Sequence, residues 1–244
     1  MDSSENFNTD YYDECNFEQA YKFSEQTFTH SELCIMLQDG NITQKQIAAL
    51  KFDTIKNPDD AELLLSNLTG CDGKIREAVA YKINKFLAEE PNIRKYFEPI
   101  SAETFAKATI DINANICRLV VNSAQYLKSN KNFRDKYITD ILSYTDEALN
   151  ELDKFIFRDK KYLINKQLFK LYWCLEAIIY FQEFIDDNKL LNILDKCISQ
   201  KEYTIREKCA EILVQTDKFT ALTEALKNDE NYYVRQVFTS SKHL

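Results

Sequence analysis

The sequence predicts an all-α protein, and three observations carry that prediction. The first is a shortage of turn residues: the 244 residues include three glycines and three prolines, and neither type occurs from Ile100 to Leu244. Tight turns and phosphate-binding loops usually need glycine, and proline marks loops and edge strands. The second observation is helical spacing of apolar residues along most of the chain. The third is a short motif that recurs at intervals typical of helix pairs.

The first expected helices lie between residues 43 and 99. Thr43 to Phe52 has an amphipathic pattern, and Pro58 begins a second helix with Asn57 as its N-cap. Asp72 is expected to cap a third helix, whose apolar side chains recur at helical spacing: Ile75, Val79, Ile83 and Phe86. A short helix or turn is expected between the two prolines at 91 and 99.

The remaining two thirds of the chain is expected to be a succession of helices. One begins at Ser101, and the others span 112–128, 131–143, 146–157, 161–186, 188–199, 203–215, 217–227 and 231–240. The segment 161–186 is apolar nearly all round, so we expect it to be central, with neighbours on two or three sides.

A five-residue motif recurs along the chain. It consists of a polar or acidic residue, two further residues, a β-branched residue and an arginine. The clear copies are Asp72-Gly-Lys-Ile-Arg76, Glu202-Tyr-Thr-Ile-Arg206 and Asn231-Tyr-Tyr-Val-Arg235, and the weaker copies are Ala114-Asn-Ile-Cys-Arg118 and Tyr162-Leu-Ile-Asn-Lys166. The β-branched residues at 75, 116, 164 and 205 are 41, 48 and 41 residues apart, which matches helix-pair units of about 40–47 residues.

This motif resembles the start of the second helix in HEAT-type repeats, and the resemblance covers residues 40–244. It implies a right-handed α-α superhelix, an armadillo-like solenoid, of about five helix pairs. In such a solenoid the second helices line a concave face. The resemblance does not imply any one function, because function lies in sites carried by a fold.

Charge divides the chain into two parts. Residues 1–40 contain nine acidic residues and one basic residue, whereas residues 41–244 contain 30 of each. We therefore expect a partly irregular acidic segment, 1–40, followed by a helical repeat domain, 41–244. One variant has the acidic segment fold back over the concave face, in which case its deletion would strengthen partner binding.

Composition also bears on compartment and on metals. The start of the chain has no basic stretch followed by an apolar one, and the seven cysteines include no CxxC pair. We therefore expect a cytoplasmic protein with reduced cysteines and no membrane span. No zinc site or cofactor is expected, because the chain has only two histidines, His30 and His243, and neither belongs to a zinc-binding motif with a cysteine pair.

The candidate binding residues are charged or aromatic side chains of the repeat motifs and of the apolar helix 161–186. On a concave face, Arg76, Arg118 and Arg206 would bind carboxylates or phosphates. The alternative is a structural ladder, in which each arginine bonds an acidic residue or a helix-terminal carbonyl of the next repeat. This second reading is the one we favour.

Three further candidates lie in 161–186. Lys166 belongs to a basic cluster with Arg158, Lys160, Lys161 and Lys170, which could hold a nucleic-acid backbone or be an exposed helix start. Trp173, the only tryptophan, is a core residue or a groove anchor. Glu176 is either a buried functional carboxylate or, as we prefer, one that faces the groove or pairs with a lysine.

No pattern for catalysis stands out. There is no histidine between residues 31 and 242, and the three glycines form no nucleotide-binding loop. We expect a non-enzymatic scaffold or adaptor that binds a protein partner on its concave face. The alternative is a nucleic-acid-binding protein like the helical-repeat DNA glycosylases, although residues 41–244 lack a basic excess. A repeat protein that handles a cofactor-bearing partner is a third class, which nothing in the sequence singles out.

Overall fold

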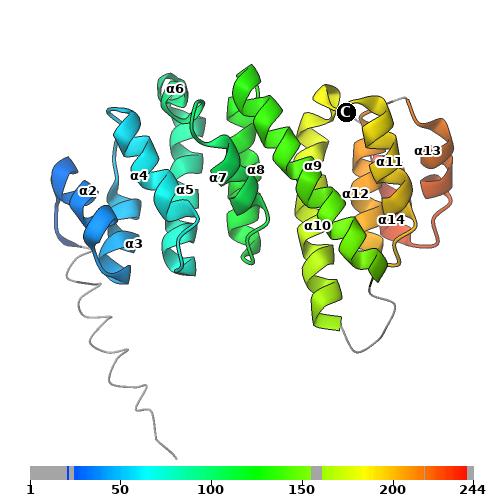
Figure 1. Ribbon diagram of the computed structural model, residues 1–244, viewed down its shortest axis with the longest axis horizontal. Helices are drawn as coiled ribbons and strands as arrows, with labels where there is room; N and C mark the ends of the chain where they lie inside the picture. Colours follow the sequence, from blue (N-terminus) through cyan, green and yellow to red (C-terminus); the bar gives the residue numbers. More distant parts are fainter. Residues whose placement is uncertain (1–20, 22–24, 155–160, 217, 241–244) are drawn as a thin grey trace, which may run out of the picture. The chain divides into compact units, whose positions relative to one another are not determined.

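Every secondary-structure element described by the computed structural model is a helix, as predicted (Figure 1). The structure describes residues 21, 25–154, 161–216 and 218–240. Contacts within the chain divide it into two compact units, Met1–Phe97 and Glu98–Leu244. We describe each unit by itself. The first twenty residues of the predicted acidic segment, and residues 22–24, lie outside the described residues.

Unit 1 is built from two helix pairs followed by short helices. Its elements are α2 (His30–Asp39), α3 (Ile42–Lys51), α4 (Pro58–Leu68), α5 (Gly73–Glu89), the 3-10 helix η1 (Pro91–Ile93) and α6 (Arg94–Phe97). Helix α2 packs on α3, and α4 packs on α5. The pairs join through contacts of α3 with α5 and of α2 with α4. The short helix expected between the two prolines is thus present.

Side-chain caps explain where these helices begin. Asn57 and Asp72 cap α4 and α5 as predicted, because their side chains accept hydrogen bonds from backbone N–H groups of the first turn. Helix α2 was not predicted, since it lies in the acidic segment. Thr29 and Glu32 form a reciprocal capping box at its start, and this Thr-x-x-Glu spacing was the sequence signal for it.

Unit 2 contains four helix pairs. Its elements are α7 (Ala102–Thr109), α8 (Ala114–Leu127), α9 (Lys131–Lys154), α10 (Lys161–Phe181), the 3-10 helix η3 (Gln182–Phe184), α11 (Asp187–Ile198), α12 (Tyr203–Val214), α13 (Thr220–Lys227) and α14 (Tyr232–Ser240). Each odd-numbered helix packs on the even-numbered helix that follows it. The first helices α7, α9, α11 and α13 contact one another in order, and so do the second helices α8, α10, α12 and α14.

One predicted break is wrong. The two helices expected at 131–143 and 146–157 are a single helix, α9, as far as residue 154, and residues 155–157 lie outside the described residues. No glycine or proline interrupts this segment. Thr145, which stands where the break was expected, is buried and donates its hydroxyl hydrogen bond back to the Ile141 carbonyl, an arrangement compatible with a continuous helix.

Helix α10 is central in unit 2, as its apolar sequence predicted. It contacts α7, α8, α9 and α12, and its buried side chains lie from Leu171 to Phe181. Phe181 packs on Tyr137 of α9, whose hydroxyl shares a 2.8 Å hydrogen bond with Thr109 of α7. Helices α7, α9 and α10 thus meet at the buried side chain of Tyr137. No helix among the described residues is long and apolar enough to cross a bilayer.

Gly40 lies where the fold leaves no space for a side chain. Its backbone φ is −69°, and no residue in the described part of the chain has a positive φ. A Cβ at position 40 would overlap the Met36 carbonyl oxygen and lie 2.9 Å from the Gln44 Cβ. At Gly70 the nearest atom, the Asn67 carbonyl oxygen, would be 3.5 Å away, which is an ordinary contact.

We expect Gly40→Ala to lower the free energy of unfolding by about 1–3 kcal/mol, because the added methyl group must push α2 away from α3. Gly70→Ala is the matched control and should change stability by less than about 1 kcal/mol. Urea denaturation followed by circular dichroism measures both. Equal stabilities for the two variants would show that the close approach at Gly40 is relieved without strain.

Candidate interaction surface

Three motif arginines make the same contact. Each is the fourth residue of its helix, and its Nη1 donates to the two backbone carbonyls six and five residues earlier. The acceptors are Gly70 and Cys71 for Arg76, Gln200 and Lys201 for Arg206, and Asp229 and Glu230 for Arg235. These carbonyls lie in the turn between the two helices of a pair. The guanidinium therefore closes that turn and satisfies carbonyls that have no helical partner.

Arg206 also links one helix pair to the next. Its Nε and Nη2 bind the two carboxylate oxygens of Asp229 at 2.7 and 3.1 Å, and both side chains are 8% exposed. Asp229 lies in the turn between α13 and α14, so the acid comes from the next repeat, as the ladder interpretation expects. The ladder interpretation also expected the backbone carbonyls to come from the next repeat. The carbonyls that Arg206 binds belong instead to its own helix pair.

The two weaker motif copies make different contacts. Arg118 is the fifth residue of α8, is exposed, and donates to the Asn115 side chain. Lys166 is the sixth residue of α10 and is exposed. Compared with the helices of the clear motif copies, α8 begins one residue earlier relative to its motif and α10 begins two residues earlier. Arg118 and Lys166 therefore lie further along their helices than the fourth position, which accounts for the different contacts. A partner-binding role for these two residues stays a prediction, as it does for Arg76 in unit 1.

Trp173 and Glu176 of α10 lie in different surroundings. Trp173 is 9% exposed and packs edge-on against Tyr172 and Phe169. The Glu176 carboxylate is half-buried and lies 2.7 Å from the ammonium group of Lys208 on α12. Glu176 thus pairs with a lysine, as we preferred from the sequence. The partner could not be named then, because it is 32 residues away.

Lys208 is a buried cation held by several groups. It bonds Glu211 at 2.7 Å as well as Glu176, and it lies over the Tyr172 ring at 5.1 Å. Burial alone would lower the pKa of Lys208, but the hydrogen bonds that its ammonium group donates to the two glutamates outweigh this effect and raise the pKa above the ordinary value. The ammonium group of Lys208 therefore stays charged at neutral pH and joins α10 to α12.

A stripe of half-buried side chains runs along α10 and α12 beside this cluster. It contains Phe169, Tyr172, Glu176 and Tyr180 of α10, and Tyr203, Glu207 and Glu211 of α12. Tyr203 also stacks on the exposed Tyr233 of α14, with ring centroids 6.0 Å apart. We call this set, together with Tyr233, the tyrosine–glutamate face. Sequence reasoning missed it because Lys208, Glu207 and Glu211 are brought beside α10 only by the packing of α12.

The charge of the tyrosine–glutamate face is unbalanced. Three carboxylates (Glu176, Glu207 and Glu211) meet one ammonium group (Lys208), which leaves two excess negative charges among the described residues. Burial, and then the neighbouring charge of Glu211, raises the pKa of Glu207. A cation arriving at this face would relieve that repulsion.

The basic cluster seen in the sequence is only partly described. Arg158 and Lys160 lie outside the described residues. Lys161 is exposed, and Lys170 bonds Glu147 at 2.7 Å and lies over the Tyr144 ring. The charge of Lys170 is therefore already paired within the protein.

The described cysteines are unpaired thiols. Cys117, Cys174, Cys197 and Cys209 are buried, and burial raises the pKa of Cys117 and of Cys174 to about 12. These two thiols stay protonated at neutral pH and are poor nucleophiles. They pack as small apolar side chains, as the apolar pattern around Cys174 had indicated.

One group of side chains could hold a metal ion. His30 and Cys34 of α2 and Asp60 of α4 place their donor atoms within 4.8 Å of one another. Sequence reasoning missed it, although His30 and Cys34 are four residues apart, a spacing that puts them on one face of a helix. The third member is 26 residues beyond Cys34, so the sequence could not place it.

Comparison with known proteins supports the fold only. No protein-family model matches the chain, and no curated protein sequence matches it. Among solved structures, the chain is similar to the crystal structure of an engineered protein from a structural genomics consortium. The TM-score is 0.51 and the identity 12%, over 89% of this chain and 98% of that one.

We expect Arg206→Ala to lower the free energy of unfolding by about 3–5 kcal/mol, because it leaves Asp229 buried without its cation. The exposed Arg118→Ala is the matched control and should cost less than about 0.5 kcal/mol. Urea denaturation at neutral pH gives both values. A loss at Arg206 no larger than at Arg118 would show that the ladder contact adds no stability.

The same ion pair predicts a dependence on acid. Hydrogen bonding by Arg206 lowers the pKa of Asp229 in the folded protein. The stabilisation that this ion pair gives the folded protein is therefore complete above the ordinary aspartate pKa of about 3.9. It is lost as pH falls through the lowered pKa of Asp229. Between about pH 5 and about pH 2, Asp229→Asn should lose less stability than the wild type. If the free energy of unfolding fell with pH by the same amount in the two proteins, this assignment would be contradicted.

Proposed function

We propose that the protein is a non-enzymatic scaffold of the HEAT-like helical-repeat type, a right-handed superhelix, that binds a basic segment of a partner protein on the tyrosine–glutamate face. The observation that carries the proposal is this face, where ring surfaces and excess carboxylates lie together on consecutive second helices. Second helices are also where the repeat resemblance locates the ligand surface.

The arrangement of the helix pairs supports a repeat scaffold. In unit 2 the second helices α8, α10, α12 and α14 contact one another in order, as do the first helices. A structure of this kind is stabilised by contacts between neighbouring pairs, and it presents an extended surface to ligands. The repeated turn contact of Arg76, Arg206 and Arg235 fits a series of related units.

The side-chain chemistry supports a cationic partner. Lysine or arginine side chains of a partner would meet Glu207 and Glu211, and their flat or extended parts would lie on tyrosine rings. Tyrosine gives a large contact area with little loss of side-chain freedom, which suits a binding surface. An acidic or phosphate-bearing partner would meet the two excess negative charges instead.

Nucleic-acid binding is the weaker candidate. It would rely on the exposed Lys161 and Lys166, while Lys170, the third lysine described in that cluster, is paired with Glu147. Phosphate contacts dominate the affinity of nucleic-acid binders, so a surface with so few available cations gives little attraction.

A peptide-binding assay tests the proposal. We expect full-length protein to bind a short fluorescein-labelled peptide of alternating arginine and glycine, and to bind neither the same peptide with glutamate in place of arginine nor a labelled single-stranded DNA. Fluorescence anisotropy at low salt measures all three. Glu207→Lys should weaken binding of the basic peptide by roughly fivefold or more, since it adds a repelling charge at the face.

Asp195→Lys makes the same change of charge at an exposed position on the first helix α11, and it should leave the peptide affinity nearly unchanged. Equal weakening by the two variants would mean that net charge alone attracts the peptide, and the proposed face would be wrong. Binding of the DNA but not of the basic peptide would move the site to the lysines of α10.

A further inference from the structure

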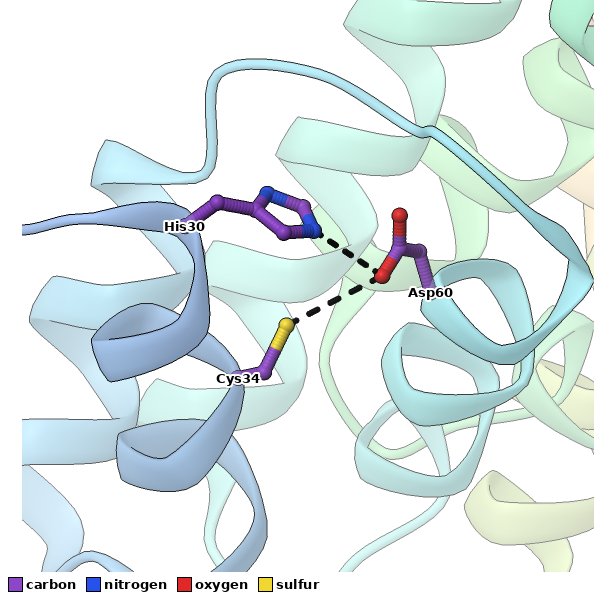
Figure 2. A group of neighbouring side chains, drawn as sticks. All are labelled: His30, Cys34 and Asp60. Carbon is purple, nitrogen blue, oxygen red and sulfur yellow. Dashed lines mark hydrogen bonds and ion pairs between the residues drawn. The ribbon is translucent and has the colours of Figure 1, made fainter.

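In unit 1, three side chains of different chemistry converge on one point. His30 and Cys34 lie one turn apart on α2, and Asp60 lies in the first turn of α4 (Figure 2). The His30 Nε2 is 3.0 Å and the Cys34 Sγ 3.8 Å from the same oxygen, Asp60 Oδ1. The imidazole and the thiol thus converge on a single carboxylate oxygen.

The spacing of the three donor atoms fits a small divalent cation. Zinc binds sulfur at about 2.3 Å and nitrogen or oxygen at about 2.0–2.2 Å, so neighbouring ligand atoms in a tetrahedron are about 3.3–3.7 Å apart. The two distances to Asp60 Oδ1 lie on either side of this range, and all three donor atoms lie within 4.8 Å of one another. Each of the two distances to Asp60 Oδ1 would need to change by only a few tenths of an ångström.

The ligands are held in place by their surroundings. The second oxygen of Asp60 accepts a 2.7 Å hydrogen bond from the Lys56 backbone N–H, which fixes the carboxylate and leaves Oδ1 directed at the other two side chains. The imidazole ring packs on the buried Phe52, with ring centroids 5.0 Å apart. Little side-chain freedom remains to be lost when an ion binds.

The charge of the group also calls for a cation. The Asp60 side chain is 5% exposed, and among the described residues its recorded ion-pair partner is His30. Its other hydrogen-bond donors among the described residues, the Cys34 thiol and the Lys56 backbone N–H, carry no charge, and a buried carboxylate is unfavourable unless it is paired with a cation. A divalent ion would supply the positive charge for both the carboxylate and a thiolate.

We propose that His30, Cys34 and Asp60 bind one Zn²⁺ ion through Nε2, Sγ and Oδ1. Binding replaces the thiol proton of Cys34, which is released to solvent, and it leaves a fourth coordination position for water or a further ligand. The ion joins α2 to α4. Helix α2 buries two of its own side chains, Leu33 and Leu37, and a metal link would add to its packing on α3 and α4.

Titration of the metal-free, full-length protein with Zn²⁺ tests the site. Isothermal titration calorimetry should show one ion per chain, and Co²⁺ in place of Zn²⁺ should give the near-ultraviolet absorption of a thiolate–cobalt bond. Cys34→Ser and His30→Gln should each weaken Zn²⁺ binding at least about tenfold, since each removes a direct ligand, and Cys34→Ser should also abolish that absorption because it removes the thiolate.

Matched controls separate the ligands from general effects. Cys71→Ser removes an exposed thiol of unit 1, and Asp59→Asn removes an exposed carboxylate next to Asp60; both should bind Zn²⁺ like the wild type. Hydrogen exchange gives a second readout, in which Zn²⁺ should slow exchange of the α2 amides in the wild type but not in Cys34→Ser. No Zn²⁺ binding by the wild type, or equal affinity in Cys34→Ser and Cys71→Ser, would overturn the proposal.

Discussion

The turn contact of the motif arginines joins the two helices in three of the helix pairs, α4–α5, α11–α12 and α13–α14. Turn carbonyls that lack a helical partner need another donor, and the turns before α12 and α14 contain no glycine that would allow a left-handed helix cap. Arg206 and Arg235 supply that donor from the second helix of the pair, because each guanidinium reaches back to two turn carbonyls. Arg206 adds Asp229, so the group that closes one turn also holds the following pair.

The cluster around Lys208 shows a second use of buried charge. Two glutamates and a tyrosine ring surround the ammonium group, and the cluster connects α10 to α12. A buried ion pair adds little net stability compared with well-packed apolar residues, but it disfavours other alignments of the two helices. The same glutamates also give the tyrosine–glutamate face its negative charge, so one set of residues aligns the helices and defines the surface chemistry.

Local features of the fold were predictable from the sequence, whereas long-range ones were not. The N-caps Asn57 and Asp72 predicted where α4 and α5 begin, because a cap is encoded within a few neighbouring residues. The spacing of the motif predicted the helix pairs for the same reason, since each copy of the motif is a short local pattern. The continuity of α9 through Thr145 was missed because polar residues there resemble a turn. The meeting of Glu176 with Lys208, and of His30 with Asp60, depends on packing between helices distant in sequence, which no local pattern encodes.

The arginine contact also has a consequence for the order of folding. A side chain at the fourth position of a helix reaches carbonyls six and five residues earlier only when the intervening residues are already wound into the first helical turn. Each turn therefore closes after its second helix has nucleated, and helix nucleation is the unfavourable step that the contact helps to offset. Because the two groups are so near in sequence, this closure loses little chain entropy. Contacts as local as these favour rapid folding.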